Sequence, residues 1–321
     1  MPSKSLHLVA SDLKPLVTLM QEMDLKLENQ LSLDAYREVV KSLSVLESVV
    51  PNNVTRNEIV ITLRDGSQSK AILYKNNDPN HANTSAGLVH IHGGGLVMGL
   101  PESNDSRHLN LCSKLGITIL AISYRKAPEY PYPTPLNDCE DGFDWFHANA
   151  ENLKVNINRI ALSGDSAGGC LAAALSQLKL NDKTNKIAHL LLLYPMLDAR
   201  TGAEVNKKDP LLGEFIWTAE MNQFGWSAYL NGQPHMSPAV PAALKSYIGL
   251  PSCWIGVGTL DLFLDENIEY ARKLIKAGVK TEFDIYPAAI HGFPKIEQAQ
   301  STIDFIHDFS NSLIKALKLT Q

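Results

Sequence analysis

The chain has no large excess of charge of one sign. It contains 29 lysine and arginine residues against 34 aspartate and glutamate residues, for a formal net charge of -5. Proteins that bind nucleic acids or anionic membrane surfaces carry basic patches or runs, and no such run occurs here. We therefore expect no nucleic-acid partner and no stable membrane association, and a small, uncharged molecule as the ligand.

Paired cysteines and long apolar runs are also absent. The four cysteines are scattered, at Cys112, Cys139, Cys170 and Cys253. They form no CxxC pair and no metal-ligand spacing, so the sequence predicts reduced thiols, no metal site and no cofactor. The first apolar stretch is broken by Ser11, Asp12 and Lys14, which is too polar for a signal peptide. No run approaches the ~18 apolar residues of a membrane span, and we expect a cytoplasmic location.

What is present is an alternation of short apolar runs with longer helical patterns. With 321 residues, 45% of them hydrophobic, the chain can bury one core without disulfides. Runs rich in isoleucine, valine and leucine occupy residues 87–92, 117–124, 160–163, 190–194, 254–257 and 282–286. Such runs, separated by helices, predict an α/β fold with a central, mostly parallel sheet covered by helices on both faces.

Two segments depart from this alternation. Residues 1–50 have helical spacing of apolar residues, as at Leu13, Val17 and Met20. An insertion at about 200–240 carries aromatic residues in a helical context: Phe215, Trp217, Phe224, Trp226 and Tyr229. We interpret residues 1–50 as a helical cap segment and residues 51–321 as the catalytic domain, with the insertion completing a lid over the sheet edge. An aromatic core helix with no role in binding is the alternative.

The segment Gly164-Asp165-Ser166-Ala167-Gly168 matches the pattern G-x-S-x-G. It lies between an apolar run and a helical pattern, which is the strand, sharp turn and helix of a nucleophile elbow. The turn requires small residues two places before and after the serine, and the helix N-terminus favours negative charge there. The sequence therefore predicts Ser166 as a nucleophile, and a glycine-rich turn that only caps a helix is the alternative.

Three consecutive glycines follow the strand that ends near Ile91. Glycine leaves backbone N–H groups uncovered and able to approach a ligand closely, as the oxyanion of a tetrahedral intermediate requires. We expect Gly93, Gly94 and Gly95 to form an oxyanion hole with the N–H of Ala167. The histidine at the strand end, His92, is expected to be structural.

The base is expected in a loop after a late strand, because this elbow occurs in chains ordered serine, acid, histidine. His291 meets this condition, since it follows the strand 281–286 and precedes Gly292. His307 lies within the terminal helical pattern, where a solvated role is expected.

The acid that orients the histidine is expected just past a buried strand. Asp261 directly follows the run 254–257 and the segment Gly258-Thr259-Leu260. Asp265 is the close competitor, although an acidic residue in the first turn of a helix is also explained by the helix dipole. Asp198 is a further alternative.

Several ordered motifs make the sequence resemble the hormone-sensitive lipase family of α/β-hydrolases, in its bacterial esterase branch. They lie between about residues 58 and 295: His92–Gly95, Tyr124–Glu129, Gly164–Gly169, Tyr194-Pro195, Ser237-Pro238, Asp261 with Asp265-Glu266, and His291–Phe293. The resemblance implies the α/β-hydrolase fold, a two-part helical cap, and oxyanion donors at the glycines and Ala167. Leu96 departs from the family, which often has an aromatic residue there.

Together these features predict a carboxylesterase that cleaves short- to medium-chain acyl esters through an acyl-enzyme. Amidase, lactonase and thioesterase activities use the same residues and remain alternatives. A non-catalytic receptor such as the plant gibberellin receptor, which resembles this family but has lost the histidine, is the rival from another class. Residues expected to contact substrate are Leu96, Asp165, Phe215, Trp217 and Ile290. A homodimer remains open.

Overall fold

The structure is a computed structural model that describes residues 3–23, 26–27, 29–44, 48–78, 85–203 and 209–319. Eight described strands form one sheet in the order β1-β2-β4-β3-β5-β6-β7-β8. Their bounds are β1 Val54–Thr62, β2 Gln68–Asn76, β3 Ser85–Ile91, β4 Thr118–Ile122, β5 Val155–Asp165, β6 His189–Leu193, β7 Cys253–Gly258 and β8 Thr281–Tyr286. β2 pairs antiparallel with β1 and β4, and the other neighbours are parallel, so the predicted mostly parallel sheet is confirmed.

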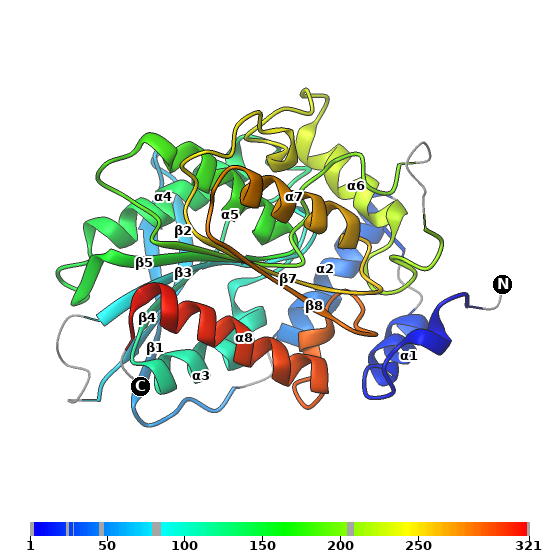
Figure 1. Cartoon of the computed structure of the whole chain (residues 1–321), viewed down its shortest axis with the longest axis horizontal. Coiled ribbons are helices and arrows are strands. Elements are labelled where there is room, and N and C mark those ends of the chain that lie inside the picture. Colours follow the sequence, from blue (N-terminus) through cyan, green and yellow to red (C-terminus); the bar gives the residue numbers. More distant parts are fainter. Residues whose placement is uncertain are drawn as a thin grey trace.

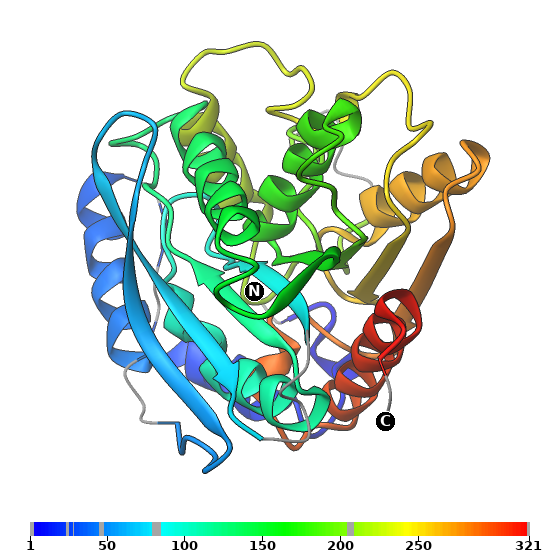
Figure 2. The ribbon, with the colours of Figure 1, turned by 90° about the vertical axis from the view of Figure 1, so that its left-hand side faces the viewer.

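Helices cover both faces of the sheet (Figure 1). α3 (Asp105–Leu115) and α8 (Gln300–Leu317) lie on one face, and α4 (Thr134–Ala148), α5 (Ala167–Leu178) and α7 (Leu264–Lys276) lie on the other. Every residue of β4, β6 and β7 is buried, which explains why these strands are continuous apolar runs in the sequence. The hairpin of β1 and β2 lies at one edge of the twisted sheet and β8 at the other (Figure 2).

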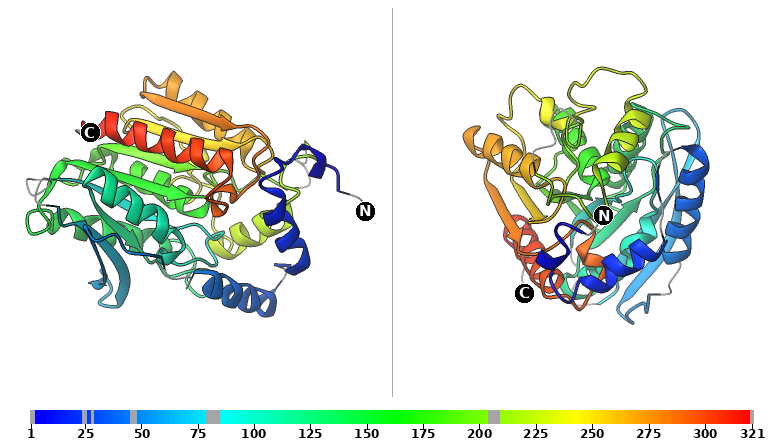
Figure 3. Two further views of the ribbon diagram at one scale, coloured as in Figure 1. Left: turned by 90° about the horizontal axis from the view of Figure 1, so that it is seen from below. Right: turned by 90° about the vertical axis from the view of Figure 1, so that its right-hand side faces the viewer.

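Three helices outside this alternation gather at one end of the sheet: α1 (Lys14–Met23), α2 (Gln30–Ser44) and α6 (Ala219–Leu230) (Figure 3). α6 is the helix of the insertion. Phe215 and Trp217 were expected within a helix, but they precede it, because Thr218 caps α6 by accepting the N–H of Met221 at 3.4 Å. Residues 204–208 of the insertion lie outside the described residues.

The N-terminal segment and the insertion share their cores with the sheet. Leu13 and Val17 are buried in one hydrophobic cluster with Phe215. Leu33 of α2 is buried in a second cluster with Trp217. The helices predicted within residues 1–50 are confirmed as α1 and α2, whereas residues 9–13 and 48–50 are not helical. The division into cap and catalytic domain remains a prediction. None of the described helices is long and apolar enough to cross a membrane.

Candidate active site

Ser166 lies at the junction of β5 and α5 in a strained backbone conformation. Its φ is 55° and its ψ is -117°, a region that side-chain-bearing residues rarely adopt. Two backbone hydrogen bonds hold it there: its N–H donates to Leu193 O at 2.9 Å, and its carbonyl accepts the N–H of Met196 at 3.0 Å. The turn therefore raises the serine side chain above the carboxyl end of the sheet.

The elbow is closed by glycines on either side of the serine. A Cβ added to Gly164 would lie 2.2 Å from Gly168 O, and one added to Gly168 would lie 2.1 Å from Ile91 O. The predicted need for small residues at both positions is thus confirmed by close backbone packing. α5 begins directly after Ser166, so its N-terminal dipole favours negative charge at this point.

The structure joins Ser166, His291 and Asp261 in one chain of hydrogen bonds. His291 Nε2 lies 3.0 Å from Ser166 Oγ, and His291 Nδ1 lies 2.8 Å from Asp261 Oδ2. The second carboxylate oxygen, Asp261 Oδ1, accepts the N–H of Phe263 at 2.9 Å. Asp261 is fully buried, whereas Ser166 and His291 remain 5% and 7% exposed. The aspartate is therefore fixed, and only the serine and histidine reach the surface of the site.

The competing acids lie elsewhere. Asp265 is in the first turn of α7, as the dipole argument predicted. Asp198 forms an ion pair with Arg200 at 2.6 Å. His307 is on α8 with its side chain 72% exposed. None of the three joins the hydrogen-bond chain.

The glycine loop after β3 lies against the elbow because β3 and β5 are neighbours in the sheet, with Ile91 opposite Gly164. A Cβ on Gly93 would be 2.9 Å from Asp165 O and 3.3 Å from the Cβ of Ser166. Within the described chain, the N–H groups of Gly93, Gly94, Gly95 and Ala167 donate to no other residue. They are free to bind an anion beside the serine.

This position is a switch point of the sheet. The chain leaves β3 through α3 to β4 on one side, and then returns to β5 and α5 on the other. Ligands of open α/β sheets bind at the carboxyl ends of strands at such points. The topology thus leaves a crevice between the two loops.

His92 supports the glycine loop. Its Nδ1 donates to Gly93 O at 2.7 Å, and its ring stacks on Tyr124 at a centroid distance of 4.4 Å. Burial lowers the pKa of His92 to about 3, so the imidazole is neutral. These contacts agree with the structural role that the sequence suggested.

Of the residues expected to contact substrate, Trp217 packs directly on the glycine loop. A Cβ on Gly95 would lie 2.0 Å from the indole ring, so only glycine fits beneath it. The same ring is 6.5 Å from His291 between centroids. Leu96 and Ile290 are fully buried and Phe215 nearly so. Asp165 turns its carboxylate to Arg107, at 2.6 Å.

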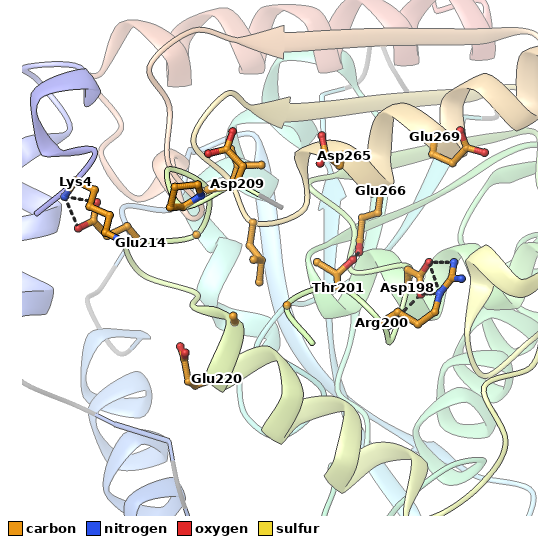
Figure 4. A pocket seen from close by; sticks show the side chains of 16 residues that line it. Lys4, Asp198, Arg200, Thr201, Asp209, Glu214, Glu220, Asp265, Glu266 and Glu269 are labelled. Atoms are coloured by element: carbon orange, nitrogen blue, oxygen red, sulfur yellow. Dashed lines mark hydrogen bonds and ion pairs between the residues drawn. The ribbon is translucent and has the colours of Figure 1, made fainter. Parts of the chain in front are cut away.

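A cavity of about 650 Å³ lies between the insertion and α7 (Figure 4). Leu262, next to Asp261 in the chain, lines it, but Ser166 and His291 do not. Apolar side chains such as Leu212 and Leu262 line it together with Lys4 and Arg200, and it carries seven carboxylates, from Asp198, Asp209, Glu214, Glu220, Asp265, Glu266 and Glu269. No group of described histidine, cysteine, aspartate and glutamate residues is arranged to hold a metal ion.

Two buried charged residues near the site, Glu266 and Arg107, were not predicted from the sequence. Glu266 accepts the N–H of Leu197 at 2.6 Å and the hydroxyl of Thr201, and burial raises its pKa well above the ordinary value. Arg107 holds Asp165 from α3, on the opposite face of the sheet from α5. Only the pair Asp265-Glu266 carried a sequence signal, as part of a family motif, and nothing local marked Arg107.

Comparisons with known proteins agree with this geometry. A family profile described as alpha/beta hydrolase fold matches residues 88–295. The chain is 27% identical to the ethyl acetate hydrolase of Pseudomonas putida over 82% of this chain and 83% of that one. It is 30% identical to Lipase 2 of Moraxella sp. (strain TA144), over 75% of this chain but only 63% of the lipase. The solved structure of a bacterial heroin esterase superposes with a TM-score of 0.84 at 27% identity, over 97% of this chain and 98% of that chain.

Proposed function

The chain belongs to the hormone-sensitive lipase family of α/β-hydrolases and is a serine carboxylic-ester hydrolase, and we propose that Ser166, His291 and Asp261 carry its reaction. One observation supports these roles above all others. The serine hydroxyl, the imidazole and the buried carboxylate form an unbroken hydrogen-bond chain beside free backbone donors. A receptor that had lost the histidine would lack this chain.

In the proposed acylation step, His291 Nε2 takes the proton of Ser166 while Oγ attacks the ester carbonyl carbon. Asp261 keeps the imidazole in the tautomer with a proton on Nδ1 and stabilises the imidazolium that forms. The carbonyl oxygen becomes an oxyanion, and we propose that the N–H groups of Gly93, Gly94, Gly95 and Ala167 are its hydrogen-bond donors. These N–H groups donate to no other described residue, so they need not break a hydrogen bond when the charge develops.

Collapse of this intermediate expels the alcohol, which receives the proton from His291, and leaves an acyl group on Ser166. Water then attacks the acyl-enzyme with His291 as the base again. A second oxyanion forms in the same place, and its collapse releases the carboxylic acid and restores the serine. Ser166 and His291 exchange every proton of both steps with the alcohol and the water, and the proposed reaction has no redox step.

The proposed substrates are esters with short to medium acyl chains. Trp217 covers the glycine loop and Ser166 is nearly buried, so space near the nucleophile is limited. The relative named ethyl acetate hydrolase acts, by its name, on a two-carbon acyl group. We propose a cytoplasmic location, which rests on the sequence alone, and the possibility of a homodimer stays open.

The test is the hydrolysis of p-nitrophenyl esters by the wild type and by Ser166→Ala. We expect the variant to lose about 10⁶-fold in kcat, as when other serine hydrolases lose their nucleophile. Circular dichroism and the melting temperature control for folding. A folded variant that keeps more than a few per cent of the turnover would show that another residue is the nucleophile.

The acyl-chain series tests the substrate class. Each methylene that fits an apolar pocket gains roughly 0.8 kcal/mol, or about fourfold in kcat/KM. We expect kcat/KM to rise from acetyl to butyryl or hexanoyl and then to fall, with slower cleavage of matched amides, lactones and thioesters. A profile that climbs past dodecanoyl with activation at a lipid interface would identify a lipase instead.

A further inference from the structure

A buried charged network lies directly beneath the nucleophile. Asp165, the residue before Ser166, has a side chain only 8% exposed, and its Oδ2 accepts a 2.6 Å ion-paired hydrogen bond from Arg107 Nη2. The Arg107 side chain is itself 9% exposed. Its guanidinium lies over the rings of Phe305 and Phe309 of α8, at 5.5 and 5.7 Å. The arginine thus spans from α3 to α8 under the elbow.

Three further titratable side chains surround this pair: His90, His108 and Lys295. His90 bonds to Ser163 Oγ through Nδ1 at 2.8 Å and to Asn104 through Nε2 at 3.0 Å. Burial, and then the charge of Arg107, lower the pKa of His90 well below its ordinary value. Burial, then His90 and Arg107, also lower the pKa of His108, while the charge of Asp165 opposes that effect. Lys295 donates to Ser103 O at 2.9 Å, and its charge also interacts with Asp165: burial lowers the pKa of Lys295, Asp165 raises it and Arg107 lowers it. Within the described chain, Arg107 is the cation that forms an ion pair with Asp165.

The Asp165 carboxylate lies close enough to the reacting groups for its charge to affect them. The Cα atoms of Asp165 and Ser166 are about 3.8 Å apart, and the oxyanion donors Gly93 and Ala167 lie on either side. Tyr194 joins this region to the base, because its ring packs on His291 at 4.4 Å. Burial raises the pKa of Tyr194, the charge of Asp165 raises it further, and the charge of Arg107 opposes that effect. An unpaired carboxylate would disfavour the oxyanion and favour the imidazolium.

We propose that Arg107 is a positioning residue that neutralises Asp165 beneath Ser166 and so keeps negative charge away from the oxyanion site and His291. This inference rests on the proposed hydrolase function. It also gives Asp165 a supporting role beneath the elbow, whereas the sequence analysis expected Asp165 to contact the substrate. Arg107 touches no reacting atom in this account and acts through the charge of Asp165.

The test compares Arg107→Met, Asp165→Asn and the double variant with the wild type, on p-nitrophenyl butyrate from pH 5 to 10. Methionine keeps most of the length of arginine and can pack on Phe305 and Phe309. For Arg107→Met we expect kcat to fall about 10- to 30-fold with little change in KM, the size expected of one uncompensated charge nearby. The acid limb of its pH–rate profile should move to higher pH, because the imidazolium is favoured.

Asp165→Asn should lose less than about threefold in kcat, since the amide keeps the shape and removes the charge. The double variant should recover to the level of Asp165→Asn, with the acid limb restored. A merely structural role predicts the opposite, with losses that add in the double variant and a profile that stays at its wild-type pH. Arg107→Lys, which keeps the cation, should retain the wild-type acid limb even if Arg107→Met folds poorly.

The outcomes separate the two proposals. If the wild type hydrolyses no ester, the proposed function fails. If the wild type is active and Arg107→Met matches it in kcat and in pH profile, or if the double variant is as impaired as Arg107→Met, the role of Arg107 is refuted while the esterase function stands.

Discussion

Asp261 and Asp265 lie four residues apart and have different surroundings. Asp261 is fully buried and bonds to both His291 and the Phe263 N–H, whereas Asp265 stands in the first turn of α7 on the wall of an open cavity. The same type of side chain therefore has two different roles: Asp261 orients the base, and Asp265 stabilises a helix end. At the residue scale, surroundings decide chemistry.

The two aspartates give a matched pair of variants. Asp261→Asn should lower kcat by up to about 10⁴-fold with little loss of folding, because the histidine loses the partner that sets its tautomer. Asp265→Asn should cost less than about 1 kcal/mol of stability and little activity. Steady-state kinetics on one ester measures both. Reversed effects would mean that the acid has been assigned to the wrong residue.

Glu266 offers a prediction on pH and stability. Its pKa is raised in the folded state by burial, so the folded protein holds this proton more tightly than the unfolded chain. The contribution to the free energy of unfolding is therefore most favourable at low pH. It declines as the pH rises from about 4.3, the ordinary glutamate value, towards the raised pKa.

Glu266→Gln should remove this decline, because glutamine keeps an oxygen for the Leu197 N–H without ionising. We expect a melting temperature at pH 8 equal to or above that of the wild type, and a smaller difference between pH 5 and pH 8. Glu220→Gln, at an exposed position on the same cavity and in the first turn of α6, is the control: it should lower the melting temperature slightly, by the same amount at pH 5 and pH 8. A large loss of stability at pH 8 would show that the charge of Glu266 is required.

At the scale of elements, α2 is fastened to the glycine loop by one side chain. Arg37 donates through Nε to Val97 O at 2.8 Å and through Nη2 to Ala127 O at 3.0 Å. It also binds both oxygens of Glu129, at 2.6 and 2.8 Å. The N-terminal segment thus contacts the chain just beyond the oxyanion donors.

Arg37→Met should lower the free energy of unfolding by about 1–3 kcal/mol, since two carbonyl groups lose a charged donor. Arg272→Met, which removes an exposed pair with Glu269 on α7, should cost less than about 0.5 kcal/mol and serves as the control. Urea unfolding measures both. Equal effects would mean that the fastening of α2 contributes little.

The same contact predicts a pH dependence. Arg37 lowers the pKa of Glu129 to about 2, so the pair stabilises the fold above the unfolded glutamate range. This contribution should be lost as the pH falls from about 4.3 towards 2, and it should be small because Glu129 is partly exposed. Melting temperatures of the wild type and Glu129→Gln should therefore converge at acid pH. Curves that stay parallel down to pH 2 would contradict this.

At the scale of the whole molecule, the N-terminal segment and the insertion complete the site that the sheet begins. Leu13 and Val17 share a core with Phe215, and Leu33 shares one with Trp217. Removal of residues 1–45 should expose these apolar surfaces, lower stability by several kcal/mol and weaken the preference for short acyl chains. The acyl series and urea unfolding of the truncated chain test this. An unchanged acyl profile would mean that the segment has no part in selectivity.

The catalytic core was largely predictable from the sequence because its determinants are local. A strand followed by Gly164–Gly168 and a helix predicts a tight elbow, and in the structure the two glycines lie against backbone atoms at close range. The buried strands could be recognised in the sequence as continuous apolar runs, because helices cover both faces of the sheet. Asp261 and His291 could be chosen because each follows a late strand, and parallel strands end at the same edge.

Only the tertiary structure decided what surrounds that core. Arg107 meets Asp165 across 58 residues of sequence, and the Trp217 ring covers Gly95 from a separate segment. The cavity lined by Leu262 combines Lys4, the insertion and α7, which the sequence did not indicate. Side-chain pairing across elements depends on how the helices pack, and neither periodicity nor spacing in the sequence encodes it.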